Sequence, residues 1–164
     1  MAPVDSNMQH TIARFVALSL IICTVAAVVG HSETQVGFCD LVKNPGLYKG
    51  KEVTVRATYR VGFEWSELYC LDCLDRGKAW LDFGDDLDRA SEKALKHTKR
   101  GGVFNLTVQG TFLGEGRYGH LGDYQYRFIA YKVSNVAVIS KGMKPVEEER
   151  KLEKLYACGG SNPK

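Results

Sequence analysis

The stretch that decides the fold is VFNLTVQGTFLGEGRYGHLGDYQYRFIAYKVSNVAVI, residues 103–139. Apolar and polar side chains alternate along residues 103–113, which is the period of two expected of a half-buried strand. A second alternating run begins at Tyr124, and the glycine-rich loop 114–122 lies between the two runs. We therefore predict two long strands, 103–113 and 124–139, joined by this loop.

Two features of these strands favour a closed barrel over an open sheet. Gly110 interrupts the apolar side of the first strand, which predicts a β-bulge or a tight bend. The second strand carries bulky side chains on both of its faces. A strand crowded on both sides suits the closing position of a small barrel better than an exposed edge.

Three more strands and one helix are predicted earlier in the chain. Alternation is nearly perfect over residues 51–61, and it indicates further strands at 63–71 and 78–83, with a turn at 72–77 between them. Residues 85–99 change to a spacing of three and four, with acidic residues early and basic residues late. That pattern predicts a helix whose charges complement its dipole.

The order of these elements resembles the OB-fold, a five-stranded Greek-key barrel. The predicted fold is mostly β, with a five-stranded OB-fold-like barrel at residues 31–143 and one helix between strands three and four. We expect residues 31–38 to lead into the barrel as a loop. One short helical turn, capped by Asp40, is expected at 39–46, where Pro45 stops it.

Both ends of the chain differ from this domain. Residues 1–30 have the pattern of a signal peptide, because Arg14 precedes an apolar run at 15–29 that is followed by small residues. The run is shorter than the roughly 20 residues that span a bilayer, so we expect cleavage, no stable membrane span afterwards, and a mature chain that begins between His31 and Gln35. The protein is then exported, either periplasmic or secreted.

At the other end, residues 144–164 are highly charged and carry only a thin apolar stripe. We interpret them as a loosely docked tail that includes a short helix.

Composition narrows the choice of partners. The chain has 45% hydrophobic and 25% charged residues, as ordinary globular proteins do. Its net charge of +3 argues against nucleic acid, since proteins that bind polyanions present a strongly basic face. A small ligand or a protein partner remains.

Residues 39–139 are similar to uncharacterised small exported bacterial proteins with OB-fold-like domains. The motifs that carry this resemblance are Cys39, Asn44-Pro45, Tyr48-Lys49-Gly50-Lys51, Gly62-Phe63-Glu64, Trp80-Leu81 and Tyr118-Gly119-His120-Leu121-Gly122. The resemblance implies an OB-like fold and export, and it transfers no catalytic residue.

Signal cleavage leaves four cysteines, Cys39, Cys70, Cys73 and Cys158, and an even number in an exported protein indicates disulfides. We predict a bond between Cys39 and Cys73. Cys39 lies just before the first strand and Cys73 in the turn that ends the second, and these two points share one end of an antiparallel meander. Cys70 is the less favoured partner, and the resemblance points to the same Cys39–Cys73 pair.

Cys70 and Cys73 also have the spacing of a redox motif or of half a zinc site. A redox pair needs a lowered thiol pKa, whereas the charges of Asp72 and Asp75 would raise it. A closed zinc site needs four ligands, typically two such pairs. We therefore predict neither a metal nor another cofactor.

Five residues are candidates for ligand binding. Trp65, Tyr69 and Trp80 fall on or near strands two and three, which form one wall of the OB-fold ligand cleft, and Tyr118 and His120 lie in the loop that forms the other. The alternatives are that the three aromatic residues belong to the core and that His120 only fixes its loop by bonding backbone carbonyls.

The sequence thus predicts an exported, non-enzymatic OB-fold-like domain that binds an unknown ligand, with no catalytic residue. One alternative is binding of single-stranded nucleic acid or oligosaccharide on the barrel face, which requires exposed aromatics beside the basic residues 96–100. The other is an enzyme that uses His120 with an acidic neighbour. The acidic residues Glu64, Glu67, Asp82, Asp85 and Asp86 are interpreted as solvated turn residues.

Overall fold

A computed structural model describes residues 34–142 together with Lys151 and Cys158. The predicted signal peptide and most of the predicted tail lie outside the described residues. The elements are β1 (Gln35–Gly37), α2 (Phe38–Lys43), α3 (Pro45–Tyr48), β2 (Glu52–Val61), β3 (Ser66–Tyr69), η2 (Leu71–Arg76), β4 (Ala79–Phe83), α4 (Arg89–Ala94), η3 (Leu95–Arg100), β5 (Gly102–Leu113), η4 (His120–Gly122) and β6 (Tyr126–Lys141), where η denotes a 3-10 helix. No helix among these is long and apolar enough to cross a bilayer.

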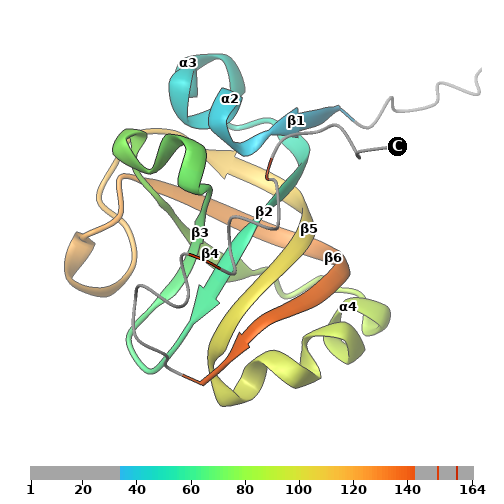
Figure 1. Cartoon of the computed structure of the whole chain (residues 1–164). Helices are drawn as coiled ribbons and strands as arrows, with labels where there is room; N and C mark the ends of the chain where they lie inside the picture. Colours follow the sequence, from blue (N-terminus) through green and yellow to red (C-terminus); the bar gives the residue numbers. More distant parts are fainter. Residues whose placement is uncertain (1–33, 143–150, 152–157, 159–164) are drawn as a thin grey trace, which may run out of the picture. The chain divides into compact units, whose positions relative to one another are not determined.

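The strands form one mixed sheet in the order β1-β2-β3-β4-β6-β5, and β2 also pairs with β5 (Figure 1). Strands β2 to β6 therefore complete a closed circuit of pairings. Strand β5 returns to lie beside β2 after three consecutively paired strands, which is the Greek-key arrangement. The pairs β1–β2 and β4–β6 are parallel, and the other pairs are antiparallel.

The prediction of five strands and a leading loop at 31–38 missed β1. This strand pairs with β2 at residues 54–56, whereas β3 pairs with β2 only at residues 58–61. Because β3 is so short, half of one edge of β2 would otherwise have unpaired backbone groups, and β1 provides their partners. Three residues are too few to show an alternating pattern.

The predicted second strand, 63–71, was too long at both ends. Gly62 donates its amide to the carbonyl of Trp65 at 2.9 Å, so residues 62–65 form a tight loop before β3. After β3, the predicted turn is the 3-10 helix η2. The predicted strands 51–61 and 78–83 are confirmed as β2 and β4 within one residue.

The predicted helix 85–99 begins four residues later, at Arg89. The Asp88 carboxylate caps it by accepting the Ser91 amide at 2.7 Å, and this bond lowers the pKa of Asp88. Its last turns are 3-10 rather than α. The predicted helical turn near Pro45 is two short helices, α2 and α3, with Pro45 at the first position of α3 and Asp40 inside α2 rather than capping it.

The two long strands are confirmed as β5 and β6. Their register shifts between Gln109 and Gly110, as the interruption of the apolar pattern predicted. A Cβ atom at position 110 would overlap the carbonyl oxygen of Ile129. The backbones of β5 and β6 therefore lie too close together here for any residue other than glycine at this position.

The core fills the inside of this circuit. The six side chains expected to be buried together, Val53, Val55, Ala57, Phe104, Leu106 and Val108, all belong to one buried cluster. Phe112 and Phe128, on β5 and β6, are fully buried in it as well.

Cys39 and Cys73 form a disulfide, as predicted, with 5.6 Å between their Cα atoms. The bond joins α2 to η2, and these two elements pack against each other. It therefore attaches the N-terminal helices to the circuit of strands.

We expect the double substitution Cys39→Ser with Cys73→Ser to lower the free energy of unfolding by about 4 kcal/mol. The bond closes a loop with a sequence separation of 34, and the entropy lost by the unfolded chain sets this value. Urea unfolding of the double variant and the parent measures it. A difference below about 1 kcal/mol would contradict a structural role for the bond.

Candidate functional site

Four side chains form a row across the outer face of the sheet. The strand register pairs Arg60 with Glu67, Glu67 with Trp80, and Trp80 with Arg127, so the row crosses β2, β3, β4 and β6. Alternation explains it, because most of the residues that flank these four along their strands are buried in the core, namely Tyr59, Leu68, Ala79, Leu81, Tyr126 and Phe128. We call these four residues the outer row.

The charges of the outer row are satisfied within the protein. Both carboxylate oxygens of Glu67 accept from the Lys78 ammonium at 3.0 Å, and the Arg60 guanidinium lies 3.9 Å away. Asp82 accepts from the indole of Trp80 at 2.7 Å and from Arg127 at 2.6 Å. Glu67 and Asp82 are therefore not solvated turn residues as predicted, whereas Glu64, Asp85 and Asp86 are exposed.

Tyr124 covers the middle of the row. Its hydroxyl donates to Glu67 at 3.2 Å, and its ring meets that of Trp80 edge-on with centroids 5.1 Å apart. Burial raises the pKa of Tyr124, and the negative charge of Glu67 raises it further.

The loop 114–125 folds back over Trp80. A Cβ at Gly119 would overlap the indole ring, so the backbone of Gly119 lies against one face of Trp80. Gly119 has a φ of +69°, a conformation that favours glycine. Tyr118 and Tyr124 exchange backbone hydrogen bonds and close the loop.

The two other predicted aromatic residues on this face are also covered. The ring of Trp65 lies against Gly62 and under the Arg60 guanidinium, 5.8 Å from its centroid. Tyr69 is buried, with the ammonium of Lys78 5.3 Å from its ring. The structure thus brings Tyr69 and Trp80 together near Glu67, but as packed residues rather than as open stacking platforms.

The two predicted loop residues behave differently from each other. Tyr118 is half-buried, and its ring lies against the backbone of Gly116. His120 is exposed, and its imidazole makes no hydrogen bond within the part of the chain that the structure describes. It therefore neither fixes its loop through side-chain bonds nor pairs with an acidic residue there.

Two large apolar side chains project into solvent from the loops beside the outer row. Phe63 in loop 62–65 is 99% exposed, and Leu121 in loop 114–125 is 75% exposed. Leu121 also has a φ of +56°, which is strained for a leucine. No other large apolar residue that the structure describes is as exposed as these two.

Sequence reasoning overlooked most of this site. It treated Glu67 and Asp82 as solvated and named neither Tyr124 nor Leu121 as a site residue. A usable signal was present, because strand alternation places Glu67 with Tyr69 on one face and Trp80 with Asp82 on one face. The strand register that brings these pairs side by side depends on tertiary structure.

Among the described residues, one group of side chains could hold a metal ion, and all of its ligand atoms are sulfur. The Sγ atoms of Cys39, Cys70 and Cys73 lie within 4.8 Å of one another. Two of these sulfurs are bonded to each other, so the cluster offers one thiol while the disulfide is intact. This arrangement does not supply the four ligands of a structural zinc site.

We expect Gly119→Ala to be more damaging than Gly50→Ala. Both glycines have a positive φ, but an added Cβ at Gly50 meets no atom within 4 Å, whereas one at Gly119 overlaps Trp80. Gly50→Ala should cost about 1 kcal/mol and Gly119→Ala about 2 to 3 kcal/mol of unfolding free energy. In a Trp65→Phe background only Gly119→Ala should shift the fluorescence of Trp80. Equal costs with unchanged emission would refute the packing of this loop on Trp80.

Tyr124 should stay protonated at pH values where an ordinary tyrosine ionises. Its raised pKa means that its contribution to stability is complete below about pH 10 and is lost as the pH rises through the folded-state pKa. NMR of ring-labelled tyrosine should show this late titration. Glu67→Gln should lower the pKa of Tyr124 and leave that of Tyr59 unchanged, because burial is the main cause that raises the latter. An unchanged Tyr124 titration in Glu67→Gln would contradict the coupling.

Comparison with known proteins assigns no family to the chain. No protein-family model matches it, and no curated protein matches it.

Proposed function

We propose that the chain is an exported, non-enzymatic binding domain with an OB-fold-like barrel. Its ligand is a protein partner that presents an apolar surface to the two loops beside the outer row. The resemblance to small exported bacterial proteins and the arrangement of the site support this proposal.

The strand connections support the OB-fold part. Strands β2, β3, β4, β5 and β6 form a five-membered Greek-key ring, and α4 with η3 lies between its third and fourth strands. An OB-fold has the same strand order and carries its helix at the same point, so this topology supports the proposed fold, with β1 as an addition along β2.

One observation carries the binding proposal, namely the location of the two most exposed apolar side chains. Phe63 lies in the loop between the first and second strands of the ring, and Leu121 in the loop between the fourth and fifth. In OB-folds these two loops flank the ligand face. Leu121 keeps both an exposed side chain and a strained backbone, a combination that costs stability and is typical of functional positions.

The charges favour a protein over a nucleic acid. Arg60, Lys78 and Arg127 face the carboxylates of Glu67 and Asp82. Cations paired in this way are not free to follow a phosphate backbone, whose binding depends on displaced counterions. Aromatic stacking with bases is also disfavoured, because Gly62 and Arg60 pack on the Trp65 ring and Gly119 and Tyr124 pack on the Trp80 ring.

The enzyme alternative has less support. It requires His120 within hydrogen-bond reach of an acidic group, and no such pair forms among the described residues. The carboxylates of Glu67 and Asp82 already accept from cations and from Tyr124 or Trp80.

Export is supported by the covalent chemistry. A disulfide between Cys39 and Cys73 persists in oxidising compartments such as the periplasm or the extracellular space. The predicted cleavage before Gln35 would also leave β1 complete.

Site-specific photocrosslinking in the producing cell tests the binding surface. A benzophenone amino acid at position 63 or 121 should form an adduct with the same partner. A benzophenone at position 47, a matched exposed leucine on α3, should form none. Phe63→Ser should reduce the adduct from position 121 at least tenfold, because both loops contact one partner.

The proposal is contradicted if position 47 gives the same adduct, or if positions 63 and 121 give none. Titrating labelled protein with a soluble hexasaccharide, and separately with a thymidine dodecamer, distinguishes the other ligand classes. Saturable shifts of the indole signals of Trp65 and Trp80 in either titration would contradict a protein partner and would identify that ligand class instead.

A further inference from the structure

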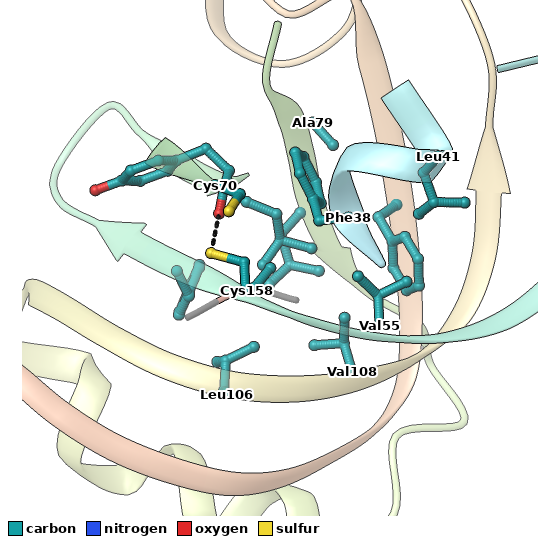
Figure 2. Close-up of a cluster of buried hydrophobic side chains, with 14 of the residues drawn as sticks. Phe38, Leu41, Val55, Cys70, Ala79, Leu106, Val108 and Cys158 are labelled. Carbon is teal, nitrogen blue, oxygen red and sulfur yellow. Dashed lines mark hydrogen bonds between the residues drawn. The ribbon is translucent and has the colours of Figure 1, made fainter. Parts of the chain in front are cut away.

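Two buried thiols lie against each other beside the Cys39–Cys73 disulfide. Cys70 is 2% exposed and Cys158 is 4% exposed, and the pKa of each thiol is shifted by the other. Figure 2 shows both side chains directed to the same point, with the Cys158 thiol donating to the carbonyl of Tyr69 at 3.9 Å. Cys158 was expected to lie on a loosely docked tail, yet its side chain belongs to the buried core cluster.

The position of Cys158 is set by β2 and β3. Its sulfur lies 3.8 Å from the hydroxyl of Thr58, and Thr58 is the register partner of Tyr69. Thr58 points outward, as Arg60 does, but it is only 1% exposed. Cys158 thus covers part of the outer face at the register pair Thr58 and Tyr69. The next register pair on that face is Arg60 and Glu67.

We propose that Cys70 and Cys158 form a second disulfide in the exported protein, which ties the C-terminal segment to the outer face of β2 and β3. This bond rests on the proposed export and on no particular binding partner.

The bond requires an oxidant, and a small-molecule disulfide such as oxidised glutathione is sufficient. One thiolate attacks a sulfur of that disulfide, forms a mixed disulfide and expels the first glutathione thiolate. The second cysteine then attacks the protein sulfur of the mixed disulfide and expels the second glutathione. The two protein thiols lose two protons and two electrons in total, and these convert the oxidant into two thiols.

The surroundings assign the roles in this exchange. Both thiols are covered in the folded protein, so the oxidant reaches Cys158 before residue 158 docks, and Cys158 is the first nucleophile. In the docked protein, the contact with Cys158 and burial raise the pKa of Cys70, so Cys70 attacks second, once Cys158 lies beside it.

A disulfide between Cys70 and Cys73 is the competing pairing, and it is less favourable than the Cys70–Cys158 bond. Cys70 also lies within 4.8 Å of the sulfurs of Cys39 and Cys73, so exchange with their disulfide is sterically open. A Cys70–Cys73 bond would release Cys39 as a thiol and detach α2 from η2. The Cys70–Cys158 bond leaves the first disulfide in place and uses the two thiols that are already in contact.

Mass mapping of the mature protein from the producing cell tests the proposal. The protein is unfolded without reductant, treated with iodoacetamide and weighed. We expect no alkylation and a mass about 4 Da below that of the reduced chain, since each disulfide removes two hydrogens. Cleavage before aspartate separates Cys70 from Cys73 at Asp72, and a peptide that links Cys70 to Cys158 should be recovered.

Two matched variants complete the test. Cys70→Ser should leave Cys158 as the single alkylated cysteine, and Cys158→Ser should leave Cys70, with the Cys39–Cys73 peptide present in both. The proposal would be overturned if Cys70 and Cys158 of the parent are alkylated in the cell-derived protein and again after refolding with oxidised glutathione. Recovery of a Cys70–Cys73 peptide from the parent would overturn it too.

Discussion

The pairing of β2 on both of its edges is the constraint on which the rest of the structure depends. Along one edge β2 pairs with β5 over its full length. Along the other edge it pairs with β3 at one end and with β1 at the other. Buried backbone groups must find partners, so this single strand fixes the return of β5 and the entry of the chain at β1. The close approach of β5 and β6 at Gly110 then allows the circuit to close.

Closure also determines which surface is open to the proposed partner. With one face of each strand directed into the core, the charged residues of β2, β3, β4 and β6 share the outer face and pair with one another. Their mutual hydrogen bonds, and the glycine backbones packed on Trp65 and Trp80, leave this face already satisfied. The two most exposed of the large apolar side chains that the structure describes, Phe63 and Leu121, lie instead in the adjoining loops.

Local patterns predicted what alternation alone can determine. Strands β2, β4, β5 and β6, the bulge at Gly110 and the Cys39–Cys73 bond all agree with the sequence, because each reflects side-chain period or position along a meander. The missed features depend on tertiary structure, as β1 has no pattern of its own and exists only as a partner for β2. In the site, the aromatic residue types were identified, but the glycines that cover them could not be anticipated without knowing how the loops fold.

Segments from both ends of the domain meet at η2, and this explains why the sulfur atoms collect there. The hydrogen bonds of a 3-10 helix have poorer geometry than those of an α-helix, and η2 is interrupted by non-helical geometry at Cys73. The element therefore has little backbone support of its own, while α2 packs on it and Cys158 lies against Cys70 immediately before it. A small domain has limited core to hold such attachments. The Cys39–Cys73 bond fixes the first attachment without enlarging the core, and the proposed Cys70–Cys158 bond would fix the second.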